Sequence, residues 1–203
     1  MFERIFSKKT KEETFWNWFS DNAHKIYKED NPNSSTYSDV GKMLRKYQED
    51  LTYEFSPIHN NGSKEFFISA DGVKDAFPAV IKLVETAPHL KNWDIIAFRQ
   101  RANFDFQLEY RGIKVTVDNF YFRYAYHDDG IALELNIKNY EEDDETWKEI
   151  GYLVLDSLLG EYDVETKITQ IEWVKFDEQN IDNLSPLKDL PDLVDNYFVD
   201  RDE

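Results

Sequence analysis

The spacing of apolar residues changes along the chain, and this change constrains the fold more than any other feature of the sequence. In the first 50 residues apolar side chains recur every three or four positions, the period of an α-helix. From residue 104 to residue 137 they alternate with polar side chains, the period of a β-strand with one buried face. The alternating positions are Phe104, Phe106, Leu108, Tyr110, Ile131, Leu133, Leu135 and Ile137. Helices and strands therefore occupy separate parts of the sequence, which predicts an α+β fold.

Local signals place the individual elements. Thr10 and Glu13 form a capping-box pattern at the start of a helix over about 11–29, and a second helix follows up to Leu51. We expect strands over 51–55 and 65–70 to form a hairpin and Asp75 to cap a crossover helix. Further along the chain, Arg111–Gly112 and Asp129–Gly130 predict tight hairpin turns between antiparallel strands. We expect a mainly antiparallel, twisted sheet of about 6–8 strands, on which an N-terminal helical pair, the crossover helix and one late helix pack. The late helix follows the acidic run 141–145 and stops at Gly160.

The length of 203 residues predicts a single domain, residues 1–203. Within it we expect a helical segment over 1–50, a sheet with two helices over 51–176 and an acidic tail over 177–203. The tail mixes Pro186 and Pro191 with acids and sparse leucines. We therefore expect an extended or short-helical segment packed lightly over the core.

The negative charge is concentrated near the C-terminus. Residues 141–203 hold 5 Lys or Arg against 20 Asp or Glu, and the whole chain has a formal net charge of −17. Such a surface repels phosphate groups, which argues against nucleic-acid binding. It favours a basic protein as the partner.

Cysteine is absent and no apolar run reaches the roughly 20 residues of a membrane helix. The first residues, Met1 to Lys11, lack the apolar core of a signal peptide. The missing membrane helix and signal peptide predict a cytoplasmic protein. The absence of cysteine excludes thiolate chemistry but is equally compatible with a cytosolic or a periplasmic location. The oligomeric state is not encoded in any of these patterns.

Common catalytic and metal-binding motifs are missing, so we expect no cofactor and no metal site. The four histidines have no helical metal-ligand spacing, and phosphate-loop, dinucleotide-binding and nucleophile-elbow patterns are absent. Two acidic clusters have structural explanations. His127–Asp129 fits a hairpin turn, and residues 141–145 fit the start of a helix, where carboxylates stabilise the dipole.

One candidate ligand site follows from the predicted crossover. If the strands over 65–70 and 93–98 are parallel, their C-terminal ends meet beside the N-terminus of the connecting helix. Asp71, Gly72, Arg99 and Arg101 would then converge on a site for a carboxylate or a phosphate. The alternative is that the arginines form structural ion pairs, and the acidic residues Glu161, Asp163 and Glu165 are candidate partners.

Four short segments resemble a group of uncharacterised bacterial proteins of similar length. They are Phe15–Phe19, Ile68–Gly72, Ala97–Arg101 and Leu159–Asp163. The resemblance implies a bacterial cytoplasmic protein and carries over no activity and no catalytic residue.

Two hypotheses of function follow. The first is a non-enzymatic binding protein that engages a basic partner protein through its acidic C-terminal third and aromatic anchors, a make-up similar to that of toxin-neutralising immunity proteins. Trp16 or Trp18 would supply such an anchor, because two residues two positions apart on a helix point in different directions. The second is a small-molecule anion site, catalytic or not, near Asp71, Arg99 and Arg101. A third explanation is that the acidity serves solubility alone.

Overall fold

The computed structural model describes residues 9–102, 107–141 and 144–199. The chain forms two compact units, residues 1–98 and residues 99–203. Each unit has its own cluster of buried apolar side chains. The sequence predicts one domain, and the single domain stays a prediction. Unfolding measurements test it by showing whether the two units unfold together.

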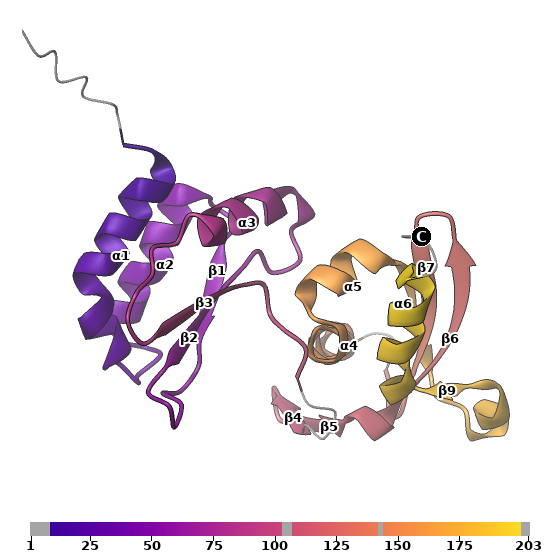
Figure 1. Cartoon of the computed structure of the whole chain (residues 1–203). Coiled ribbons are helices and arrows are strands. Elements are labelled where there is room, and N and C mark those ends of the chain that lie inside the picture. Colours follow the sequence, from indigo (N-terminus) through magenta and orange to yellow (C-terminus); the bar gives the residue numbers. More distant parts are fainter. Residues whose placement is uncertain (1–8, 103–106, 142–143, 200–203) are drawn as a thin grey trace, which may run out of the picture. The chain divides into compact units, whose positions relative to one another are not determined.

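Between residues 9 and 98, the described part of the first unit contains three α-helices and a three-stranded sheet in the order β1-β2-β3 (Figure 1). Its elements are α1 (Lys11–Tyr27), α2 (Ser35–Tyr47), β1 (Thr52–Phe55), β2 (Lys64–Ser69), the short 3-10 helix η1 (Lys74–Ala76), α3 (Phe77–Glu85) and β3 (Trp93–Ala97).

The capping box predicted for α1 is present. The Thr10 hydroxyl accepts from the backbone N–H of Glu13, and the Glu13 carboxylate accepts from the N–H of Thr10. Strands β1 and β2 form the predicted antiparallel hairpin, and β2 and β3 are parallel. The crossover between β2 and β3 is therefore confirmed, with α3 as its helix.

The start of the crossover helix differs from the prediction. Asp75 lies inside η1, and Ala76 occupies the cap position of α3 without any side-chain hydrogen bond. Pro78 stands in the first turn of α3, where its missing N–H costs no helical bond. The fixed φ of proline, rather than an acidic cap, marks where this helix begins.

Aromatic rings fill much of the core of the first unit. Phe66 on β2 stacks on Phe19 of α1, with ring centroids 4.8 Å apart. Trp16 is buried and its indole N–H donates to the carbonyl of Leu83 in α3, whereas Trp18 is only half-buried. Aromatic contacts of this kind stabilise the unit beyond the area that they bury.

The residues of the second unit that the structure describes form three α-helices, a two-stranded sheet (β4-β5) and a four-stranded sheet in the order β8-β7-β6-β9 (Figure 1). Its elements are β4 (Gln107–Tyr110), β5 (Ile113–Thr116), η2 (Val117–Asn119), β6 (Phe120–His127), β7 (Gly130–Ile137), α4 (Glu145–Leu159), α5 (Glu161–Lys167), β8 (Ile168–Lys175), η3 (Glu178–Asn183), β9 (Ser185–Pro186), η4 (Leu187–Asp189) and α6 (Leu190–Val199).

Two tight hairpins lie where the sequence predicts them. Arg111 and Gly112, both at positive φ, connect β4 to β5, and Asp128–Asp129 connects β6 to β7. The alternation along β7 places Ile131, Leu133, Leu135 and Ile137 in the core. Phe104 and Phe106, with which the alternating pattern begins, lie outside the described residues.

Helix α4 begins and ends as predicted. The Asp144 side chain accepts from the N–H of Thr146, and Gly160 ends the helix at a φ of 81°. A further helix, α5, then starts directly at Glu161, which the sequence analysis did not predict. The carboxylates of its first turn lie at the positive end of the helix dipole, which favours this second start.

The C-terminal segment is not lightly packed, contrary to the prediction. Leu187, Leu190 and Val194 are fully buried in the core of the second unit. Pro191 is the second residue of α6, a position that tolerates proline because the N–H there has no helical partner. The two prolines that suggested an irregular tail therefore flank a helix start.

The α+β class is confirmed, and antiparallel pairs predominate over the parallel pairs β2–β3 and β7–β8. The strands of the described residues are divided among three small sheets rather than joined in one sheet. No helix within the described ranges is long and apolar enough to cross a membrane.

Candidate functional site

Asp71 and Gly72 form a turn directly after β2. Both have positive φ, 50° and 80°, and the backbone N–H of Asp71 donates to the Ser69 hydroxyl. Gly72 fits this turn because it adopts positive φ without strain. The turn precedes η1 and α3, as the predicted site requires.

Arg99 and Arg101 belong to the second unit, and carboxylates of that unit bind both. A guanidinium nitrogen of Arg99 lies 3.2 Å from Asp156 Oδ2, and the backbone N–H of Arg99 donates to the Glu161 carboxylate. The Arg101 guanidinium contacts Asp163 at 2.8 Å and Asp195 at 2.7 Å. These carboxylates raise the pKa of Arg101 above its ordinary value.

Residues 99–102 form further hydrogen bonds with α4 and α5. The backbone N–H of Ala102 donates to the carbonyl of Ser157, and the N–H of Glu161 donates to the carbonyl of Arg99. The side-chain Nε of Arg101 donates to the carbonyl of Leu159. A Cβ at position 160 would come within 3.2 Å of the Arg99 oxygen, so Gly160 leaves room for this approach. Residues 99–102 are therefore fixed to the junction of α4 and α5.

Two carboxyl groups of this cluster are withdrawn from solvent, that of Glu161 fully and that of Asp156 partly. Glu161 is completely inaccessible to solvent. Burial raises the pKa of Asp156 to about 6, because Arg99 only partly offsets the loss of hydration and Glu161 adds negative charge nearby. Raised carboxyl pKa values occur at active sites and in structural ion-pair networks, and the many protein partners here favour the structural explanation.

The four residues of the predicted anion site are thus divided between the two units. Asp71 and Gly72 lie in the first unit, and Arg99 and Arg101 in the second. Their convergence stays a prediction. The structural alternative is supported for the arginines, since Asp163 and Glu161 are among the partners that the sequence suggests.

A broad open groove of about 920 Å³ lies in the first unit between α1 and α3. Its charged centre is Glu12, which binds Lys82 at 2.9 Å and accepts from the Tyr47 hydroxyl at 3.2 Å. These partners lower the pKa of Glu12 to about 2. The groove therefore presents charges that are already compensated.

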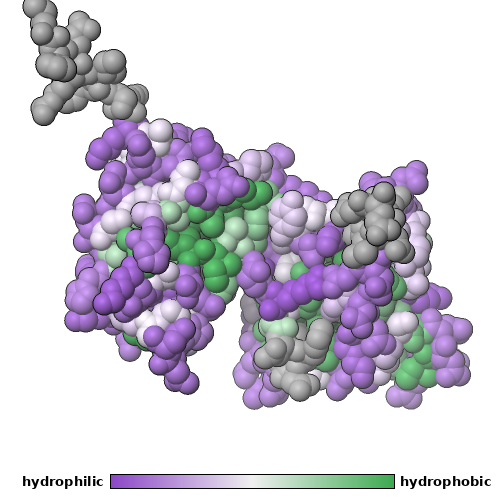
Figure 2. All heavy atoms as spheres, viewed as in Figure 1, coloured by the Kyte–Doolittle hydropathy of each residue, from purple (hydrophilic) through white to green (hydrophobic). Residues whose placement is uncertain are grey.

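The strongest electrostatic feature is the exposed acidic surface of the C-terminal segment. Glu178, Asp182, Asp189 and Asp192 are exposed, and within the described residues none of them forms an ion pair. We call these four residues the acidic surface. Asp189 and Asp192 are three residues apart and share one side of η4 and α6. On the face in view, hydrophilic residues dominate the second unit (Figure 2).

An apolar side chain stands within this acidic surface. Ile181 lies in η3 between Glu178 and Asp182, and 42% of its surface is exposed. Exposed apolar groups ringed by charge are common at protein–protein contacts.

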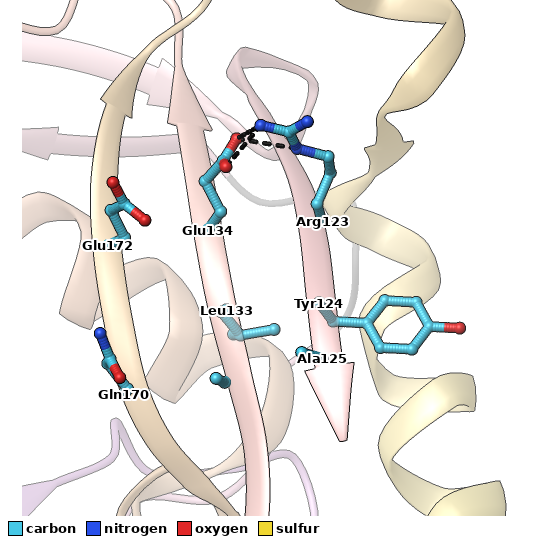
Figure 3. A pocket seen from close by; sticks show the side chains of 8 residues that line it. Arg123, Tyr124, Ala125, Leu133, Glu134, Gln170 and Glu172 are labelled. Carbon is cyan, nitrogen blue, oxygen red and sulfur yellow. Dashed lines mark hydrogen bonds and ion pairs between the residues drawn. The ribbon is translucent and has the colours of Figure 1, made fainter. Parts of the chain in front are cut away.

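A second feature of the second unit is a hollow of about 330 Å³ on the face of β6, β7 and β8 that points away from the buried core (Figure 3). Its floor is the pair Ala125 and Ala132, which lie opposite each other on β6 and β7. Its charged row is Arg123, Glu134 and Glu172, which are cross-strand neighbours on the three strands. Figure 3 shows the Arg123 and Glu134 side chains pointing toward one another, while the ring of Tyr124 points away.

Sequence reasoning missed the hollow and Asp156, whereas Glu161 is among the partners that it suggested for the arginines. The strand register that aligns Ala125 with Ala132 and Gln170 includes a bulge between Ile131 and Ala132, which no local pattern reveals. For Asp156, its position one turn before Gly160 in the apolar C-terminal half of α4 was an available signal.

Comparison with protein-family models finds no match, and comparison with curated proteins finds none. The resemblance to bacterial proteins of similar length therefore stays a prediction. Among the residues that the structure describes, no group of three or more His, Cys, Asp or Glu side chains is arranged to hold a metal ion.

Proposed function

We propose that the protein is a non-enzymatic binding protein of the bacterial cytoplasm whose second unit engages a basic partner protein. The observation that carries the proposal is that the acidic surface is part of a folded segment. Its acids are exposed, while Leu187, Leu190 and Val194 of the same segment are fully buried.

This anchoring favours a binding surface over a solubilising tail. Acids on a flexible tail lose conformational entropy when a partner orders them, whereas acids on an anchored helix are already in place. The anchored arrangement therefore supports recognition at a lower entropic cost than the lightly packed tail that the sequence suggests.

Ile181 adds an apolar contact to the electrostatic one. Charges steer the encounter and set its salt dependence, whereas most of the affinity of an interface comes from a few buried apolar or aromatic anchors. A partner that places Lys or Arg side chains around an apolar pocket would match Glu178, Ile181 and Asp182. Toxin-neutralising immunity proteins act in this general way.

The test measures binding of a ten-lysine peptide to the full chain by calorimetry. The first variant carries E178Q, D182N, D189N and D192N, and the matched control carries D21N, E49Q, E85Q and D94N at exposed positions of the first unit. Both variants have the same net charge. We expect the first to bind about tenfold more weakly at low salt, since exposed ion pairs contribute about 0.2 to 1 kcal/mol each, and the control to bind like wild type.

Salt and peptide charge provide the second control. Binding of the lysine peptide should disappear as salt shortens the Debye length from about 10 Å at 0.1 M to about 3 Å at 1 M. An acetylated peptide without positive charges should not bind at any salt concentration. Equal weakening in both variants would contradict the proposal and favour solubility as the role of the acidity.

The alternative anion site has a separate test. A ligand at one hundred times its dissociation constant would stabilise the protein by about 2.7 kcal/mol, so a panel of anionic metabolites would raise the melting temperature if the site exists. Because Arg99 and Arg101 already bind carboxylates, we expect no such shift.

A further inference from the structure

The sheet face that bears Ala125 and Ala132 is the second surface on which a partner can dock in the second unit. Phe122, Leu133 and Leu135 point from the same sheet into the core, where side chains of α4 and α6 cover them. Neighbouring residues along each strand point to the opposite face. That face carries Arg123, Ala125, Ala132, Glu134, Gln170 and Glu172.

The hollow exists because two short side chains lie opposite each other. Ala125 pairs with Ala132 in the β6–β7 register, and Ala132 pairs with Gln170 in the β7–β8 register. Around this floor stand longer side chains, as Figure 3 shows. An extended aliphatic chain can therefore lie over the two methyl groups.

The two carboxylates beside the hollow differ in their partners. The Glu134 carboxylate accepts hydrogen bonds from Arg123 Nε at 3.0 Å and from Asn136 Nδ2 at 2.9 Å. Arg123 and the amide lower the pKa of Glu134, although its burial opposes them. Glu172 is exposed and, within the described part of the chain, forms no ion pair. One carboxylate therefore remains available for a cation from outside.

We propose that this hollow accepts a lysine or arginine side chain of the basic partner. The aliphatic stem lies over Ala125 and Ala132, and the charged head binds Glu172, with the Gln170 amide oxygen as a second acceptor. Lysine and arginine suit this arrangement because their stems are apolar and their heads are charged. The inference rests on the proposed function and names where a basic residue of that partner docks.

The shape and charge favour a protein side chain over a free anion. With Arg123 neutralised by Glu134, the local excess charge is the carboxylate of Glu172. The hollow is open on one side, so it covers only one side chain of a ligand. The rest of the ligand would bind outside the hollow, for example at the acidic surface. A small molecule would find too few contacts for tight binding.

The test follows the methyl signals of Ala125 and Ala132 by NMR while the full chain, labelled at alanine, is titrated with the ten-lysine peptide. Both signals should shift in the same titration that saturates binding. The substitution E172Q should weaken binding roughly two- to fivefold. The control E109Q removes a carboxylate on the separate β4–β5 sheet that Lys114 already pairs, and it should leave binding unchanged.

The substitution A132L fills the hollow. It should abolish the shift of the Ala125 methyl signal while the acidic surface still binds the peptide. If the peptide binds in a salt-dependent manner but neither methyl signal moves and E172Q matches E109Q, the hollow is not the docking site and the proposed function stands. If no salt-dependent binding occurs at all, the proposed function is wrong, and the proposed docking of a basic side chain in the hollow is wrong with it.

Discussion

The two units differ in charge and in the kind of side chain that fills their cores. The first unit holds 13 Lys or Arg against 15 Asp or Glu, and the second holds 11 against 26. Rings such as Phe19 and Phe66 dominate contacts in the first core, and aliphatic side chains of β7 and α4 dominate the second. The net charge of −17 therefore describes neither half of the chain, and the proposed electrostatic function is assigned to the second unit for this reason.

The units also differ in the charges that they bury. The first unit buries a cation, Lys64, which is 3% exposed and donates to the carbonyl of Glu29 beyond the end of α1 and to the Tyr37 hydroxyl, and it also buries the carboxylate of Glu12. The second unit buries Glu161 fully and Asp156 partly where residues 99–102 bind. The first unit therefore buries charges of both signs, whereas the second buries carboxyl groups at this junction.

The largest expected effects test whether the cores are independent. Phe66→Ala should destabilise the first unit by about 3 to 5 kcal/mol and Leu135→Ala the second by about 2 to 5 kcal/mol, because each leaves a cavity among fully buried neighbours. Hydrogen exchange on the full chain should show faster exchange only in the unit that carries the substitution. Faster exchange throughout the chain for either variant would instead support the single-domain prediction.

Two helical glycines give the next largest contrast. A Cβ on Gly151 of α4 would lie 2.2 Å from the Trp173 ring, whereas on Gly41 of α2 it would meet Arg45 and Tyr53 at 3.3 Å. We expect Gly151→Ala to destabilise the second unit by about 1 to 3 kcal/mol through overpacking. Gly41→Ala should be nearly neutral, because the helix propensity of alanine offsets the tighter contact. Chemical denaturation of both variants checks this, and equal effects would refute the packing difference.

Much of this architecture could be predicted from the sequence where local chemistry decides the structure. The capping box at Thr10, the hairpin turn at Arg111–Gly112 and the stop at Gly160 are read within a few residues. The crossover β2–α3–β3 followed from the order of the elements.

The missed features depend on contacts between distant residues. Helix α6 has leucine and valine at helical spacing, but two prolines obscure it until Leu187 and Leu190 are seen in the core of the second unit. The partners of Arg99 and Arg101 come from α4, α5 and α6, about 60 to 95 residues away in sequence. The anion site was inferred from strand topology alone, which says nothing about these competing carboxylates.

Acid should affect the two units in opposite directions. The pKa of Asp156 is raised to about 6, so the proton that it binds stabilises the folded state at low pH, and this stabilisation is lost as pH rises from about 4 through 6. The pKa of Glu12 is lowered to about 2, so its contribution is present above pH 4.5 and is lost as pH falls toward 2.

The matched variants D156N and E12Q separate these effects. Between pH 7 and pH 5 the second unit of wild type should gain at most about 1.4 kcal/mol of stability relative to D156N, because only the pH unit below the pKa of about 6 contributes before discounting for partial exposure. The stability difference between E12Q and wild type should disappear only as the pH falls below about 4. Denaturation at several pH values measures the stability of both variants. A stability difference between D156N and wild type that does not change with pH would show that burial does not raise the pKa of Asp156.

The most direct test of the account is a map of amide chemical-shift changes on the full chain at saturating ten-lysine peptide. The account predicts that the changes concentrate in the second unit, at residues 178–192 and along β6, β7 and β8, and that the amides of α1, α2 and α3 are unaffected. Changes of equal size in both units, or changes confined to the first unit, would contradict the assignment of partner binding to the acidic second unit.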